Sequence, residues 1–248
     1  SHAMTRQEWI DKCNHWKQKW PVMQPEYLDD TNGLNIYAVL DALYRHAPDD
    51  AVFMADAGTA FYTVPQSIRI RAEQRLVHSH SQGDMGWALP ASIGVAKAGA
   101  KNVICIVGDG SFMSNMQELA VIKEHNLPIK IIILNNKGYL SIKNTQGKFY
   151  EGRIHGVNPK TGLWFPNMED VASAFKIKAG RAWSIKTLDK YVEMAMKQTA
   201  PYLLDCVCTE DQIIMPAQTF KKGQQAPLHD MFPFLSDEEL QQEMVVSL

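Results

Sequence analysis

Two short polar segments of this sequence carry the residue types that bind a metal ion and a phosphate. Gly108-Asp109-Gly110-Ser111 follows the apolar run at 103–107, and Asn135-Asn136-Lys137-Gly138-Tyr139 follows the apolar run at 129–134. In an open α/β sheet, ligands bind beyond the carboxyl ends of strands, where glycine lets the backbone approach a phosphate and a helix N-terminus provides N–H donors. The Asp109 carboxylate would repel a phosphate unless a cation lay between them, so the first segment predicts a bridging Mg²⁺.

The second segment offers the amide oxygen of Asn136 to the same cation, provided that the two strands are neighbours in the sheet. Hard oxygen ligands favour Mg²⁺ or Ca²⁺ over zinc. Either segment alone has an ordinary structural explanation, because Asp-Gly is a common turn and Asn-Asn-x-Gly is a common loop. Together, with a strand before each and a helix between them, they favour a shared metal site.

The elements that would position these segments alternate along the chain. Helical spacing predicts helices at 34–44, 88–98, 116–124 and 188–198, and apolar β-branched runs predict strands at 51–55, 103–107, 129–134 and 202–208. The runs at 103–107 and 129–134 are almost continuously apolar, as in central strands that helices cover on both faces. The sequence therefore predicts an α/β fold with a doubly wound, mainly parallel sheet.

We divide the chain into four parts. Residues 1–4 have the character of a cloning scar with a start Met, 5–32 of a connector helix and linker, 33–209 of the main domain, and 210–248 of a C-terminal tail with a helix near 236–243. The connector helix would carry Trp9, Cys13, Trp16 and Trp20 on one face. Residues 147–167 predict a long functional loop, whose aromatic side chains would form a lid, an interface or ordinary packing.

Composition excludes several classes of function. The 248 residues include 25 basic and 27 acidic side chains, so no strong field would attract nucleic acid or an anionic membrane. The apolar runs are far shorter than the roughly 20 residues that cross a bilayer, and residues 1–4 lack the sections of a signal peptide. The four cysteines, Cys13, Cys105, Cys206 and Cys208, form no CxxC pair, which favours a cytoplasmic protein.

The two segments together resemble the thiamine diphosphate motif, in which Gly108-Asp109-Gly110 is followed, after 24 residues, by Asn135-Asn136. The stretches at 108–119 and 83–91 are similar to the corresponding stretches of acetohydroxyacid (acetolactate) synthases, and Asp56-Ala57-Gly58 falls where that family has its first diphosphate-binding turn. The resemblance runs from about Trp16 to the end of the chain. It implies that residues 33–209 form a thiamine diphosphate-binding domain, the C-terminal third of such an enzyme.

The resemblance also implies a role for each residue of the site. Asp109, Asn136 and the carbonyl of Gly138 would bind Mg²⁺. Met85 would be the hydrophobic wedge that bends the cofactor, a role that suits its flexible side chain, with plain core packing as the alternative. The other contacts to the diphosphate and the aminopyrimidine would come from turns and helix starts, namely Gly58, Thr59, Ala60, Gly83, Gly110, Ser111, Tyr139 and Leu140.

The resemblance implies an enzyme that decarboxylates a 2-oxo acid such as pyruvate and passes the two-carbon carbanion to an acceptor carbonyl. In this family the Glu that activates the cofactor belongs to a separate pyrimidine-binding domain, usually of another subunit, and no glutamate of this chain falls at that place. We therefore expect the chain alone to be inactive and to work with such a domain of the same or another chain, in a homo-oligomer. FAD, common in the synthases, lies in that family mostly against a domain that is absent here. We therefore expect no FAD on this chain, although the full-length parent would be able to bind it.

Departures from the synthase pattern concern the substrate. Where the synthases have a Gly-rich run before the wedge, this chain has His78-Ser79-His80-Ser81-Gln82, and Thr145 stands where synthases that prefer 2-oxobutyrate carry Trp. His80 or Gln82 is a candidate for substrate contact, and a structural histidine is the alternative. Four other functions stay open: a 2-oxo acid decarboxylase, a keto-sugar ligase of polysaccharide synthesis, the β subunit of a split enzyme, and a non-catalytic regulator.

Overall fold

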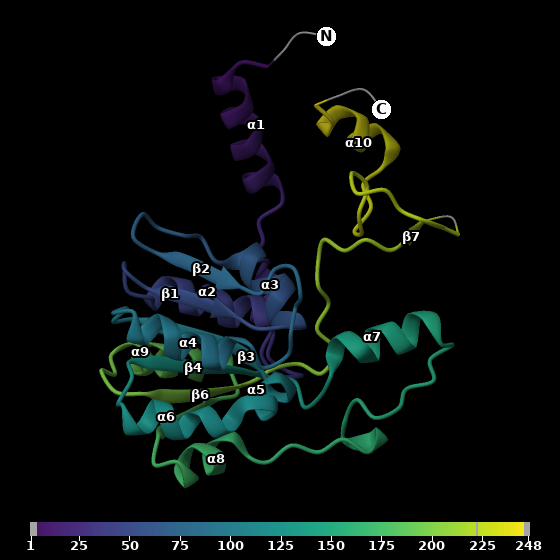
Figure 1. The fold of residues 1–248 in the computed structure, drawn as a ribbon. Helices are drawn as coiled ribbons and strands as arrows, with labels where there is room; N and C mark the ends of the chain where they lie inside the picture. Colours follow the sequence, from purple (N-terminus) through teal and green to yellow (C-terminus); the bar gives the residue numbers. More distant parts are fainter. Residues whose placement is uncertain (1–3, 222, 246–248) are drawn as a thin grey trace. The chain divides into compact units, whose positions relative to one another are not determined.

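The computed structural model describes residues 4–221 and 223–245 (Figure 1). The chain divides after Gln212 into two compact units, Ser1–Gln212 and Ile213–Leu248, which we describe separately. The first unit contains the sheet and every residue that the sequence analysis singled out as a site residue. No helix among the described residues has both the length and the apolar character needed to span a membrane.

A six-stranded sheet forms the centre of the first unit. Its strand order is β2-β1-β3-β4-β6-β5, and every neighbouring pair is parallel. Successive strands lie to one side of β1 and then to the other, which confirms the predicted doubly wound, parallel topology. The strands are β1 (Val52–Ala55), β2 (Arg75–His78), β3 (Val103–Gly108), β4 (Ile129–Asn135), β5 (Lys178–Ala182) and β6 (Tyr202–Val207).

Helices cover both faces of this sheet and bury two apolar clusters (Figure 1). One cluster lies under α2 (Ile36–His46), α3 (Thr59–Ser67) and α9 (Ile185–Met196), and the other lies under α4 (Ala88–Lys97), α5 (Asp109–Asn115), α6 (Leu119–Glu124) and α8 (Met168–Ala174). Side chains of one strand alternate between the two clusters, as the period of a β-strand requires.

Strand β3 shows why the central strands are so uniformly apolar. Ile104 and Ile106 point into the first cluster, whereas Val103, Cys105 and Val107 point into the second. All five side chains are buried, because the sheet has no face open to water. Full burial of one such aliphatic side chain stabilises the fold by about 1.5–3 kcal/mol.

The predicted helices are present, but one of them begins earlier than the sequence pattern indicated. The helical segment expected at 116–124 starts at Asp109, as α5, and continues through the 3₁₀ turn η2 (Met116–Glu118) into α6. Its first turn contains Gly110 and Ser111, residues of low helix propensity, so the apolar periodicity becomes visible only from Met116. Tertiary packing of Phe112 against the sheet stabilises that first turn.

Several elements lacked a clear sequence signal. The edge strands β2 and β5 are short and partly polar, and α3 contains Pro65. Helix α7 (Leu140–Phe149) has only one buried residue, Leu140, and so lacks an apolar stripe. It takes up the first residues of the segment 147–167, in which the structure also places the short 3₁₀ turn η3 (Pro159–Thr161); the rest of that segment is irregular, as predicted.

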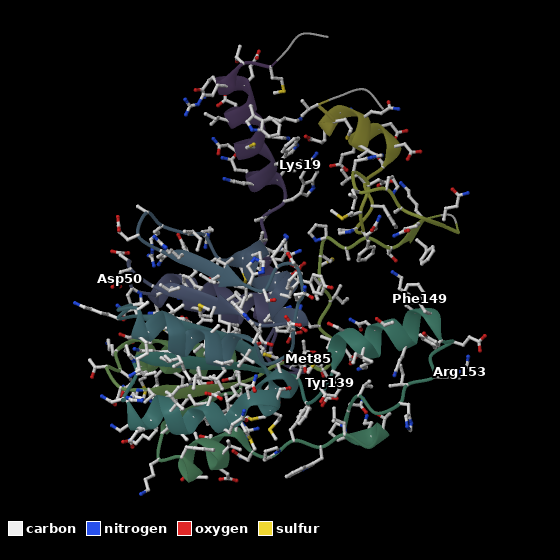
Figure 2. All side chains as sticks on the ribbon, viewed as in Figure 1. Lys19, Asp50, Met85, Tyr139, Phe149 and Arg153 are labelled. Atoms are coloured by element: carbon white, nitrogen blue, oxygen red, sulfur yellow. The ribbon has the colours of Figure 1, made fainter. Side chains whose placement is uncertain are left out.

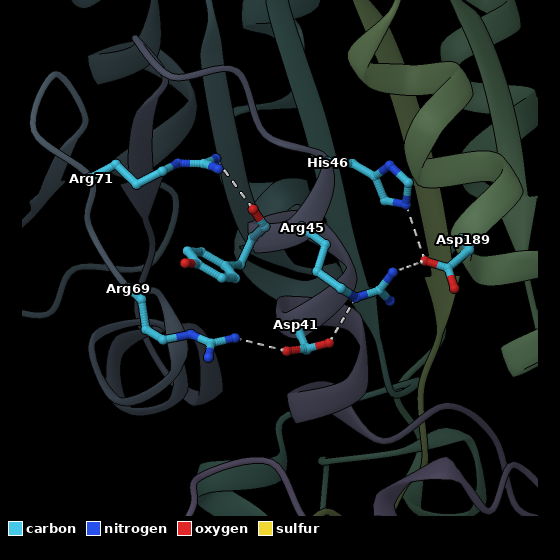
Figure 3. Close-up of polar contacts among 7 residues, drawn as sticks. Asp41, Arg45, His46, Arg69, Arg71 and Asp189 are labelled. Atoms are coloured by element: carbon cyan, nitrogen blue, oxygen red, sulfur yellow. Dashed lines mark hydrogen bonds and ion pairs between the residues drawn. The ribbon is translucent and has the colours of Figure 1, made fainter. Parts of the chain in front are cut away.

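Surface ion pairs join α2 to α9 and to the segment that follows α3 (Figure 3). Arg45 pairs with Asp189 at 2.7 Å and with Asp41 at 2.9 Å, and Arg69 pairs with Asp41 at 3.2 Å. His46 lies 3.1 Å from the same Asp189 carboxylate. Because Arg45 and Asp189 are about half exposed, each pair adds less than about 1 kcal/mol.

The segments at the two ends of the chain have local structure of their own. In the first unit, α1 (Arg6–Lys19) begins with a capping box formed by Thr5 and Glu8, and Trp9 packs edge-on against Trp16 at 5.8 Å, which confirms the predicted tryptophan face. The short 3₁₀ helix η1 (Pro25–Leu28) follows it. The second unit holds a two-stranded hairpin, β7 (Phe220–Lys221) with β8 (Gln224–Gln225), and the predicted helix α10 (Asp237–Glu243).

Candidate functional site

The two polar segments come off the same edge of the sheet. Strands β3 and β4 are parallel neighbours, with Gly108 paired to Leu134, so the residues that follow each strand emerge side by side. Asp109 is the first residue after β3, and Asn136 is the first after β4. Both line one cavity together with Gly138. The adjacency of the two strands, on which the predicted metal site depends, is therefore confirmed.

Asp109 presents a buried carboxylate to this cavity. One oxygen accepts a hydrogen bond from its neighbour's N–H, that of Gly110, at 2.7 Å, and the other accepts from the N–H of Gly138 at 3.1 Å. Burial raises the pKa of Asp109 to about 7, against the opposing effect of these N–H donors, and the nearby Asp205 adds to the rise. A carboxylate buried in this way is stabilised by a cation at the same place.

Asn135 and Asn136 have different environments although they are adjacent. The amide of Asn135 donates to the buried Asp205 at 2.9 Å, and its oxygen accepts from the N–H of Lys137 at 3.3 Å. The amide oxygen of Asn136 is buried and has no hydrogen-bond partner among the residues that the structure describes. Because an unpartnered buried acceptor is costly, this oxygen is suited to a ligand that brings a positive charge or a donor.

The loop that follows β4 packs without spare room. The N–H of Tyr139 donates to the carbonyl of Val157 at 2.9 Å, and the Tyr139 ring lies edge-on to Phe165 at 5.7 Å. A Cβ atom on Gly138 would overlap the Val157 carbonyl, and one on Gly110 would overlap the Tyr139 ring. Val157 and Phe165, both in the long segment 147–167, thus pack against this loop. That part of the segment is therefore packed and does not act as a lid.

The cavity gathers most of the residues predicted from sequence (Figure 2). Figure 2 labels Met85 and Tyr139, which both line it. His80 and Gly83 do not line it; they line a neighbouring pocket that shares Gly58 with the cavity. The predicted residues that line the cavity are Gly58, Thr59, Ala60, Met85, Asp109, Gly110, Ser111, Asn136, Gly138, Tyr139 and Leu140.

Rings and amides surround the neighbouring pocket. Phe61 stacks on His80 at 5.9 Å and meets His78 edge-on at 5.6 Å, and the two imidazoles are 5.0 Å apart. Tyr62 and Gln82 line the same pocket. Burial, with a smaller contribution from His80, lowers the pKa of His78, so this ring is neutral at pH 7. Its Nδ1 atom is buried and has no partner among the described residues.

Sequence reasoning missed the part that Asp56 plays. This side chain, 1% exposed, accepts hydrogen bonds from the N–H groups of Ala57 at 2.8 Å, Gly86 at 2.9 Å and Ala88 at 2.7 Å. It therefore ties the end of β1 to the segment around Met85. An acidic residue directly after a buried strand was the only available signal, and it does not indicate which distant backbone groups it binds.

The side-chain oxygens of Asp109 and Asn136 are of the type that a hard divalent cation prefers. They are a carboxylate and an amide oxygen at adjacent strand ends, with the Gly138 backbone beside them. Among the described residues no group of three or more His, Cys, Asp and Glu side chains is placed to hold a metal. Helix α3 starts at Gly58 without a side-chain cap, which suits a phosphate near its N-terminus.

Known proteins share this sequence pattern. Residues 56–206 match the family described as "Thiamine pyrophosphate enzyme, C-terminal TPP binding domain". The acetolactate synthase large subunit of Porphyra purpurea is 32% identical over 209 residues, which cover 84% of this chain and 34% of that protein. The chloroplastic acetolactate synthase of Arabidopsis thaliana is 30% identical over 213 residues, covering 84% and 31%. The chain spans about a third of the length of the curated relatives it matches.

Proposed function

This chain belongs to the thiamine pyrophosphate enzymes, as a C-terminal TPP binding domain of the acetolactate synthase type, and we propose that it binds the diphosphate of that cofactor through Mg²⁺. The whole enzyme would decarboxylate a 2-oxo acid, pyruvate in the first instance, and ligate the resulting two-carbon unit to an acceptor carbonyl. The observation that carries the proposal is the unpartnered, buried amide oxygen of Asn136 beside the buried carboxylate of Asp109.

Asp109, Asn136 and the Gly138 carbonyl would hold Mg²⁺. The carboxylate supplies the negative charge, and the two neutral oxygens complete the protein's share of the ligands, leaving the remaining positions to phosphate oxygens and water. The raised pKa of Asp109 in the metal-free chain is consistent with a cation site, because a proton there neutralises the buried carboxylate as a cation would.

Backbone groups around Gly58 and Gly110 would bind the phosphate oxygens. Gly58 has a φ of 64° and precedes α3, and Gly110 lies in the first turn of α5. The lack of a side chain on Gly58 lets an anion approach the N–H groups at the start of α3, whereas the missing side chain of Gly110 makes room for the Tyr139 ring. The cation would offset the charge of Asp109. Thr59 and Ser111 stand beside them with hydroxyl groups, and both line the cavity.

Met85 would set the conformation of the cofactor. Its side chain is 42% exposed and lines the cavity, whereas the backbone beside it is fixed by Asp56. Such a side chain is available to pack between the two rings of a bound ligand. The cofactor, when bound, supplies the electron sink that decarboxylation of a 2-oxo acid requires.

We place the acceptor in the pocket beside Gly58. His80 and Gln82 provide hydrogen-bonding groups there, and Phe61 and Tyr62 provide ring faces. A ring-lined site with hydrogen-bonding groups suits a hydroxylated carbonyl compound as well as a simple oxo acid, which keeps a keto-sugar ligase as the second candidate function. A His80→Ala variant of the assembled enzyme should raise the KM for the acceptor and leave the affinity for the cofactor unchanged.

A pyrimidine-binding domain, of the same or another chain, would supply the activating Glu. Large apolar side chains of α7 and the segment after it stay exposed, namely Ile142, which lines the cavity, Tyr150 at the end of α7, and Trp164 at 76%. A second domain of the parent enzyme, or of a partner subunit in a homo-oligomer or a split enzyme, would cover them. FAD in the parent, and a cytoplasmic location, stay predictions from the sequence.

Calorimetric titration tests the proposal. Thiamine diphosphate should bind the wild-type chain with Mg²⁺ and at least about tenfold more weakly after chelation of the metal, a change of about 1.4 kcal/mol. Asp109→Asn should abolish this metal dependence. Asp170→Asn, at the exposed first turn of α8, is the matched control and should behave as wild type. Equal affinities with and without Mg²⁺ in the wild-type chain would contradict the metal assignment.

A further inference from the structure

The peptide that follows Met85 is held from two sides. The Gly86 N–H donates to Asp56 at 2.9 Å, and the Gly86 carbonyl accepts from the side-chain amide of Asn115 at 2.8 Å. Asp56 follows β1 and Asn115 ends α5, so the two anchors belong to different strand–helix units. Both polar groups of a single peptide residue are therefore satisfied by side chains that are distant in sequence.

Asp56 also defines where α4 begins. Trp87 occupies the N-cap position of this helix and makes no side-chain cap, which would leave the first N–H groups without a partner. Asp56 accepts from the N–H of Ala88, the first residue of the helix, at 2.7 Å. A negative charge at this end is also favourable to the helix dipole. The carboxylate thus replaces the missing cap from 32 residues away in sequence.

Gly86 lets the backbone after Met85 approach α5 closely. Its φ of 86° lies in the left-handed region, and a Cβ atom there would come within 2.8 Å of the Ser114 Cβ and 2.9 Å of the Asn115 amide nitrogen. The backbone therefore sits directly on α5, the helix whose first residues are Asp109 and Gly110. A side chain at position 86 would therefore push this backbone away from α5, the helix that carries the predicted metal ligand.

Met85 precedes the Gly86 peptide that Asp56 and Asn115 hold, but its own side chain is partly exposed. It is 42% exposed and lines the cavity, and its side chain belongs to neither of the two apolar clusters. We propose that Asp56 and Asn115 are positioning residues that hold Met85 at a set distance from the diphosphate site, so that the cofactor's rings are bent to one geometry. This inference rests on the proposed function, in which Met85 contacts those rings.

Asp56 is not itself a ligand for the cation or the phosphates. It does not line the cavity, and its two oxygens accept from the N–H groups of Ala57, Gly86 and Ala88. Its effect must reach the cofactor through the backbone around Met85. Loss of this side chain should therefore affect contacts to the rings of the cofactor and spare those to its diphosphate.

Comparing a ligand that has the rings with one that lacks them distinguishes contacts to the rings from contacts to the diphosphate. We would titrate the 248-residue chain, in saturating Mg²⁺, with thiamine diphosphate and with inorganic pyrophosphate, which lacks the rings. In Asp56→Asn an NH2 group replaces one carboxylate oxygen and cannot accept, so the N–H of Gly86 or that of Ala88 loses its acceptor. The affinity for thiamine diphosphate should fall about tenfold, as expected for the loss of one charge-assisted hydrogen bond, whereas that for pyrophosphate should change less than about twofold.

Asn115→Ala provides a second variant in case Asp56→Asn does not fold. Asn115 is only partly buried, and its removal should shift the ratio of the two affinities in the same direction. Val103→Ala, which opens a small cavity at the far end of β3, is the control for a general loss of stability. It should leave the ratio at its wild-type value.

Amide hydrogen exchange gives a readout that does not involve the cofactor. The N–H groups of Gly86 and Ala88 should be protected in the wild-type chain and exchange at least about tenfold faster in Asp56→Asn, because their acceptor is weakened. Equal losses for both ligands, or unchanged exchange at Gly86 and Ala88, would overturn the inference. Absence of binding of either ligand to the wild-type chain would instead contradict the proposed function, and the exchange rates would still decide whether Asp56 holds the segment.

Discussion

Buried polar side chains at the carboxyl edge of the sheet fall into two groups at the scale of single residues. Asp56 and Asn135 have their hydrogen-bonding capacity used by protein partners, so they act as parts of the structure. Asp109 and Asn136 instead line the cavity, and the buried amide oxygen of Asn136 has no partner among the described residues. Access to the cavity separates the candidate ligands from the residues that support them, because Asp56 and Asn135 do not line it.

Asp109 should make the stability of the metal-free chain depend on pH. Its pKa is raised to about 7 in the folded chain and is near 3.8 in the unfolded chain, so the folded state holds the proton more tightly. The associated stability is present below pH 4 and is lost as pH rises through 7, by at most about 1.4 kcal/mol for each pH unit between these values. Urea unfolding of wild type and Asp109→Asn at several pH values measures this difference.

The variant supplies the control for that series, because an amide does not titrate. Wild-type stability should fall relative to Asp109→Asn from pH 4 to pH 7, and Mg²⁺ with thiamine diphosphate should reverse the trend for the wild type alone. Parallel pH curves for the two proteins would show that Asp109 is not protonated in the folded, metal-free chain.

The two adjacent asparagines should respond to alanine in opposite ways. Asn135→Ala removes the amide that donates to the buried Asp205, a carboxyl group whose pKa is already raised by burial. The loss of this hydrogen bond should cost about 1–3 kcal/mol of stability. Asn136→Ala removes an oxygen that has no partner and should cost less than about 1 kcal/mol, yet weaken Mg²⁺-dependent cofactor binding. Thermal unfolding and titration of both variants measure the contrast; a larger stability loss for Asn136→Ala would contradict it.

At the scale of elements, the strand ends were the most predictable feature of the sequence. The runs before Asp109 and Asn135 are continuously apolar because both faces of β3 and β4 are covered, and such runs are easily recognised. Their parallel pairing followed from the alternation of strands and helices. The sequence could therefore predict that Asp109 and Asn136 lie at adjacent strand ends, whereas their binding of a metal stays a proposal.

Other elements could not be predicted, for physical reasons. Helix α7 is stabilised by what surrounds it rather than by an apolar stripe, and the edge strands β2 and β5 have one neighbour each, so their composition is weakly constrained. The role of Asp56 depends on backbone groups 30 and 32 residues away, and no local pattern encodes such a pairing.

Two glycines test how tightly the loop after β4 is packed. Gly138→Ala places a methyl group against the Val157 carbonyl and should destabilise the chain by about 2 kcal/mol or more. Gly94→Ala, in α4, meets no atom within 4 Å and should stabilise it by up to about 1 kcal/mol. Chemical unfolding of the two variants provides the comparison. A neutral Gly138→Ala would show that the loop is able to move.

At the scale of the whole molecule, the chain corresponds to one part of its relatives. It matches about a third of the length of its acetolactate synthase relatives, and the exposed side chains of Ile142 and Trp164 lie in and after α7, whose first residues line the cavity. The cavity between the ends of β3 and β4 supports the proposal that the chain holds a diphosphate and a cation. We expect the carboxylate that activates the cofactor to come from a pyrimidine-binding domain.

The 248-residue chain alone should therefore form no acetolactate from pyruvate. Supplying a pyrimidine-binding domain that carries the activating Glu, as the parent chain or as a separate subunit, should restore turnover, and the purified chain should be colourless because it binds no flavin. Product formation by the chain alone would show that one of its own glutamates activates the cofactor. A Glu→Gln change in the added domain is the control and should abolish the restored activity.

The position of a bound ion tests the account most directly. Crystals of the chain with thiamine diphosphate and Mn²⁺, which replaces Mg²⁺ and scatters anomalously, would locate the metal. We predict a single anomalous peak within about 2.3 Å of both a carboxylate oxygen of Asp109 and the amide oxygen of Asn136. A cofactor bound with its metal elsewhere, or with no metal between these two side chains, would contradict it.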